Sequence, residues 1–112
     1  MYETSLVAAD IAGGQRIVAE VERIIRVTAA LWLYLEEEDE WKLVIVSPDV
    51  EERGPIDLYT RIAVIVNNLS VDPQNPVQTP FTSISLVSPN SLLYDRIKHF
   101  GRTMKSHVYK ME

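Results

Sequence analysis

The chain has 112 residues, of which 46% are hydrophobic and 24% are charged, and its formal net charge is −5. This length suits one domain with a real core, and the composition excludes disordered, collagen-like and low-complexity chains. The sequence has no cysteine, which excludes disulfides, thiolate metal sites and a cysteine nucleophile. Net acidity argues against nucleic-acid binding, which depends on clustered Lys and Arg.

The amino terminus has no basic flank followed by an apolar stretch, so we expect no secretory signal. The apolar runs, such as residues 29–35 and 43–46, are short, whereas a membrane span needs about 20 apolar residues. We therefore expect a cytoplasmic protein without a membrane partner.

The first predicted element is an amphipathic helix over residues 15–27. From Ile17 onward, apolar residues recur every three or four positions, with charged residues between them. Gly13 and Gly14 interrupt the pattern, each at a cost of about 1 kcal/mol relative to Ala. The sequence therefore does not decide whether the helix includes the turn before these glycines.

Residues 29–35 and 41–46 are aromatic and β-branched runs around the acidic connector 36–40, which predicts a β-hairpin. A turn centred on Glu38 and Asp39 would place Tyr34 opposite Leu43. Pro55 suits the first position of a helix, and apolar residues at helical spacing continue that helix to Leu69.

Residues 70–80 contain three prolines, which excludes a regular helix or a central strand. Alternation over residues 81–88 predicts a third strand, and Ser88 can cap a final helix that includes Ile97 and Met104 and extends toward Val108. The predicted order is α-β-β-α-β-α in a single α+β domain over residues 1–112. Its mixed three-stranded sheet combines the hairpin with a third strand that runs parallel to the second. The third strand could lie beside either strand of the hairpin. We expect the helices to cover mainly one face of the sheet.

Both faces of the predicted hairpin are apolar, although a half-solvated sheet alternates apolar and polar residues. Either helices cover both faces, or the aromatic face associates with a second copy or with another protein. The candidate interface residues on that face are Trp32, Tyr34, Trp41, Leu43 and Ile45.

Two similar turns follow the second and third strands. Ser47-Pro48-Asp49 and Ser88-Pro89-Asn90 would meet at the carboxyl edge of parallel strands, where open α/β sheets bind ligands. Ser47, Asp49, Ser88 and Asn90 are therefore candidate ligand-binding residues. The same residue types also suit ordinary strand ends and helix caps.

Glu40-Trp41-Lys42 superficially resembles the acid-x-Lys motif of the PD-(D/E)xK nucleases, which implies acids holding a divalent metal and a lysine supporting an activated water. In this chain the apolar strand follows the motif instead of preceding it. A strand of about seven residues separates Glu40 from Asp49, about 23 Å at about 3.3 Å per residue. A divergent metal-dependent nuclease is the weakest of the alternatives.

The two histidines, His99 and His107, are predicted to lie on the surface, with His99 one helical turn after Asp95. The sequence carries no Gly-rich phosphate loop and no nucleophile elbow, so we expect no catalytic residue, metal or cofactor. The preferred hypothesis is a non-catalytic association module that forms a homodimer or binds another protein through its aromatic sheet face.

Overall fold

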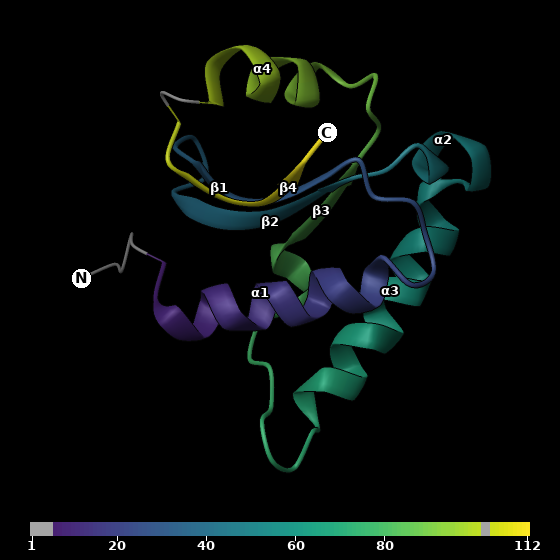
Figure 1. The fold of residues 1–112 in the computed structure, drawn as a ribbon, viewed down its shortest axis with the longest axis vertical. Helices are drawn as coiled ribbons and strands as arrows, with labels where there is room; N and C mark the ends of the chain where they lie inside the picture. The colour runs from purple at the N-terminus through teal and green to yellow at the C-terminus, as the bar shows by residue number, and fades with distance from the viewer. Residues whose placement is uncertain (1–5, 102–103) are drawn as a thin grey trace.

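The computed structural model describes residues 6–101 and 104–112 (Figure 1). Along the chain, the elements are α1 (Ala8–Val21), β1 (Ala29–Leu35), β2 (Glu40–Val46), α2 (Asp49–Arg53), α3 (Pro55–Ser70), the 3-10 turn η1 (Phe81–Ser83), β3 (Ile84–Val87), α4 (Leu92–Phe100) and β4 (Ser106–Met111). Among the described residues, none of the helices has the length and apolar character needed to cross a bilayer.

The described strands form one sheet in the order β3-β2-β1-β4. The antiparallel pairing of β1 with β2 confirms the hairpin, and β3 pairs with β2 in parallel, as the sequence predicts. The hairpin register is two residues away from the expected one, because Tyr34 lies opposite Trp41. The connector forms a four-residue turn in which Asp39 adopts a positive φ of 52°. A shift of two residues leaves every side chain on its expected face, since strand side chains alternate with period two.

The fourth strand corrects the prediction of three strands and a long final helix. The final helix ends at Phe100, and β4 pairs antiparallel with β1. At its two ends, the Tyr34 amide donates to the Lys105 carbonyl and the Glu112 amide donates to the Thr28 carbonyl, both at 3.0 Å. The segment satisfies backbone groups of β1 that would otherwise lie at a sheet edge, and this long-range pairing overrides the weak helical pattern.

Helices cover both faces of the sheet, which corrects the expectation that they pack mainly on one. Figure 1 shows α1 and α3 on one side and α4 on the other. On the α1 side, Trp32, Leu43 and Ile45 join a core with residues of α1 and α3. On the opposite side, Leu31 and Val44 pack with Tyr94 and Ile97 of α4. The two-sided apolar hairpin is therefore covered within one chain.

Helix α1 begins and ends earlier than predicted, at Ala8 and Val21, and it contains both glycines. Gly14 is needed for close packing, since a Cβ there would lie 2.5 Å from the Tyr109 hydroxyl and 2.6 Å from Trp32 Nε1. Gly13 faces Val77 of the proline-rich connection, which is a loop as predicted.

Candidate functional site

The structure separates the five candidate interface residues into two groups. Trp32 is 3% exposed, and Leu43 and Ile45 are fully buried beneath α1 and α3. A partner therefore has no access to these three side chains in the folded chain, which corrects their assignment to an interface. Tyr34 and Trp41 lie at the hairpin end of the same face and stay half-buried.

Tyr34 and Trp41 belong to a larger group at this end of the sheet, which we name the aromatic corner: Tyr34, Trp41, Lys105, His107 and Tyr109. The Tyr34 and Trp41 rings lie opposite each other on β1 and β2, with centroids 5.5 Å apart. Lys105 Nζ lies 5.1 Å from the centroid of the Tyr34 ring. On β4, the rings of His107 and Tyr109 meet edge to face at 5.2 Å. The corner thus extends across β2, β1 and β4.

Tyr109 anchors this group to α1. The Trp32 indole donates to the Tyr109 hydroxyl at 3.0 Å, and that hydroxyl donates to the Ile11 carbonyl at 2.5 Å. Burial raises the pKa of the Tyr109 phenol above its ordinary value. Because the first turns of α1 are tied to β4 through one hydroxyl group, the corner has a fixed position.

Tyr34 has a polar partner of its own in the turn that follows β1. Its hydroxyl donates to the Asp39 carboxylate, and this bond is the main reason why the pKa of Tyr34 is raised. The Tyr34 side chain is therefore contacted by Asp39 at its hydroxyl and by Trp41 at its ring.

Lys105, His107 and Tyr109 are not predicted as functional residues from the sequence, because the predicted final helix extends toward Val108. The signal that could have found them is the period-two pattern of the segment 106–111, in which His107 and Tyr109 alternate with Val108. A six-residue alternation without a clear turn on either side is weak evidence beside the helical pattern that precedes it.

The first Ser-Pro turn forms internal contacts. Ser47 is fully buried, and its hydroxyl accepts a hydrogen bond from the Asp49 amide at 3.1 Å. Asp49 in turn accepts from the backbone amide of Arg26 at 2.9 Å and from the Arg26 guanidinium at 3.0 Å. Bonding to Arg26 holds the pKa of Asp49 below its ordinary value. These contacts tie the start of α2 to the segment before β1.

The second turn is bonded to α2. Ser88 donates to the Glu51 carboxylate, and Asn90 Nδ2 donates to the same group at 3.2 Å. These bonds lower the pKa of Glu51. The two turns do lie at one edge of the sheet, since the Ser47 amide donates to the Val87 carbonyl at 3.0 Å. Their side chains are engaged in helix and turn contacts, and the ligand-site hypothesis gains no support from this geometry.

Glu40 and Lys42 form an ion pair at 3.1 Å, and Lys42 Nζ also donates to the Thr82 carbonyl at 2.8 Å. In residues 6–101 and 104–112, no group of three or more His, Asp or Glu side chains is arranged to hold a metal ion. His99 contacts Asp95 across 3.5 Å, as the sequence predicts.

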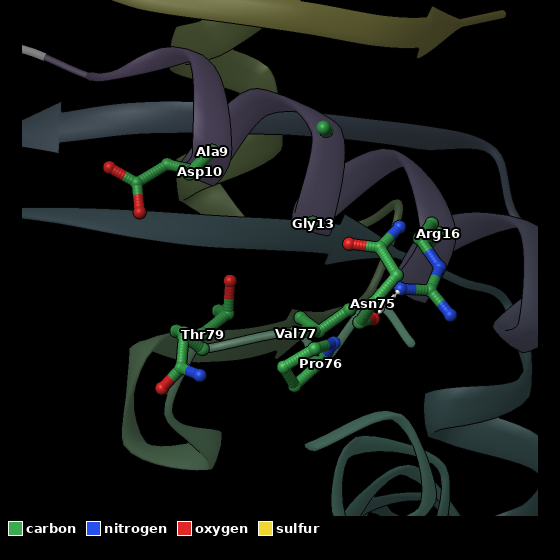
Figure 2. Close-up of a pocket in the computed structure, with 10 residues that line it drawn as sticks. Ala9, Asp10, Gly13, Arg16, Asn75, Pro76, Val77 and Thr79 are labelled. Carbon is green, nitrogen blue, oxygen red and sulfur yellow. Dashed lines mark hydrogen bonds between the residues drawn. The ribbon is translucent and has the colours of Figure 1, made fainter. Parts of the chain in front are cut away.

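A small pocket lies between α1 and residues 75–79 (Figure 2). Asp10 and Arg16 lie toward opposite ends of it, and Arg16 bonds to Asp72 at 2.9 Å and to the Asn75 carbonyl. Its volume of about 110 Å³ is below the range of about 300–1,000 Å³ usual for ligand pockets. The contacts of Arg16 indicate that it fixes the loop to α1.

No family model, no curated protein and no solved structure matches this chain.

Proposed function

We propose that this chain is a non-catalytic association module that binds another protein, or a second copy of itself, through the aromatic corner. The observation that carries the proposal is the half-buried Tyr34–Trp41 pair with Lys105 above the Tyr34 ring. Elsewhere on this face, the aromatic residue Trp32 is covered by the chain's own helices.

The chemistry of the corner suits protein recognition. Aromatic side chains offer a large contact area at low entropic cost, and they are enriched among the residues that contribute most to interfaces. A lysine above a tyrosine ring adds a cation–π contact, which strengthens when water is removed from it. The tie from Tyr109 to α1 holds the group in place before a partner arrives, which lowers the ordering cost of binding.

Self-association is tested by light scattering coupled to size exclusion over a range of concentrations, followed by charge substitutions. Lys105→Glu changes an exposed side chain of the corner, and Trp41→Glu changes a half-buried one. Val64→Glu is the matched control, since Val64 is 56% exposed on α3. Circular dichroism identifies any variant that fails to fold. A dimer that Lys105→Glu dissociates and Val64→Glu leaves intact supports self-association at the corner, whereas a wild-type chain of single mass at all concentrations refutes it.

Binding to another protein is tested in cells of the source organism with a photo-crosslinking amino acid at position 34 and, as control, at position 64. A discrete cross-linked product at position 34 alone supports the proposal. Absence of any product at position 34, together with a single-chain mass in solution, refutes it.

A further inference from the structure

Strand β4 is an edge strand: within the described residues it pairs with β1 alone. An edge strand presents backbone N–H and C=O groups that a strand of another chain can bind. On the α4 side of this edge, the side chains of Val108 and Met111 are 47% and 41% exposed. Phe100, at the end of α4, is 60% exposed. The edge is therefore open and partly apolar.

A shallow hollow of about 310 Å³ lies between α4 and the end of β4. It is lined by Met111 and by residues of the α4 end: Ile97, Lys98, His99 and Gly101. A strand added beside β4 would pass this hollow on one face of the sheet and His107 and Tyr109 of the aromatic corner on the other, since strand side chains alternate between faces.

The charge of this region differs in sign from that of the remaining chain. Residues 96–112 contain five Lys and Arg and one acid, a net charge of +4, so the net charge of −5 for the whole chain leaves −9 on residues 1–95. One of the five cations, Arg102, lies outside the described residues. Lys110 is neutralised within the chain by Glu22 at 3.1 Å and Glu112 at 3.2 Å. Lys98 and Lys105 lie over tyrosine rings and are exposed to solvent.

The positive charge of residues 96–112 favours one of two possible occupants of the β4 edge over the other. Symmetric pairing of two β4 strands would bring two basic segments together, and like charges opposite one another destabilise such pairing. A segment with acidic side chains would instead meet Lys98 and Lys105. We propose that the open edge of β4 receives an extended acidic segment of another protein as a fifth strand; this inference rests on the proposed association function and names the partner class.

The test measures fluorescence anisotropy of labelled peptides of about eight residues against the full chain. One peptide alternates Val with Glu, and its matched control alternates Val with Lys. We expect the acidic peptide to bind at least about tenfold more tightly, and its binding to weaken between about 0.02 M and 0.3 M salt. A third peptide, acidic but N-methylated at every backbone nitrogen of its central residues, cannot donate ladder hydrogen bonds from either edge and is expected to bind at least about tenfold more weakly than its parent.

Charge reversal on the protein locates the site. The double variant Lys98→Glu/Lys105→Glu is expected to weaken binding of the acidic peptide by at least about tenfold. Arg61→Glu is the control, since this side chain lies on α3, which covers the face opposite α4. Amide hydrogen exchange should show added protection in β4 when the acidic peptide is bound.

The inference is overturned if the acidic and basic peptides bind equally, if N-methylation has no effect, or if a homodimer forms in which β4 amides are already protected. In the last case the proposed association function survives while the fifth-strand inference fails. A chain that binds none of the peptides, yet cross-links at position 34, likewise overturns this inference alone.

Discussion

Replacing Gly14 by alanine places a methyl group in space that two aromatic side chains occupy. The added Cβ would lie 2.5 Å from the Tyr109 hydroxyl and 2.6 Å from Trp32 Nε1. These two atoms also form a side-chain hydrogen bond between β1 and β4. The indole belongs to a central strand and is 3% exposed, so it has little room to move away.

The magnitude follows from three contributions. Crowding in a packed core costs about 1–3 kcal/mol, and a buried indole N–H separated from its acceptor costs about 1–3 kcal/mol more. Alanine is favoured over glycine inside a helix by about 1 kcal/mol, which offsets part of this cost. We expect Gly14→Ala to lower the free energy of unfolding by about 1–5 kcal/mol, and the melting temperature by about 5–25 °C.

The neighbouring glycine provides the control. A Cβ at Gly13 would lie 3.1 Å from Val77 Cγ1 and 3.4 Å from Thr79 Oγ1, a contact that loop side chains can relieve by a small movement. Gly13→Ala should therefore stay within about 1 kcal/mol of the wild type. Urea unfolding followed by circular dichroism measures both variants. If Gly14→Ala is as stable as Gly13→Ala, the close approach of Trp32 and Tyr109 to α1 is wrong.

Three further predictions concern hydrogen bonds and pH. Tyr109→Phe should lower the free energy of unfolding by about 1–3 kcal/mol, because it leaves the Trp32 indole N–H unpaired. The double variant with Gly14→Ala should lose less than the sum of the two single variants, since the hydroxyl that crowds the new methyl group is gone. A fully additive double-mutant cycle would contradict this. Because the pKa of Tyr109 is raised by burial, the unfolded chain loses that proton first, so stability should fall as pH rises above about 10. Tyr109→Phe should show a shallower alkaline decline, and an unchanged slope would count against the burial. The pKa of Asp49 is lowered by Arg26, so the stability that Asp49 contributes is present near neutral pH and is lost as pH falls below about 4. Asp49→Asn should be less stable than the wild type at pH 7 and should lose less stability on acidification, which thermal unfolding at pH 7 and pH 3 would measure. Equal losses of stability in both proteins would refute the pairing.

The sequence by itself was sufficient for features that depend on local pattern. The aromatic and β-branched runs at residues 29–35 and 41–46 predicted the hairpin, and the period-two geometry of a strand then assigned each side chain to a face. Helical spacing after Pro55 predicted α3, which begins at that residue. The repeated Ser-Pro turns indicated parallel strands, and β2 and β3 are parallel.

Only the tertiary structure decided which distant segments meet. The six residues of β4 have no strong preference of their own, and they form a strand because β1 offers a free edge about 75 residues earlier in the sequence. That pairing assembles the aromatic corner, since it brings Lys105 over the Tyr34 ring and places His107 and Tyr109 beside Trp32. The same packing gives Gly14 its role, because the space that a methyl group would fill is defined by side chains from two strands. Local pattern assigns a residue to a face, whereas burial, register partners and close approaches depend on contacts between segments far apart in the chain.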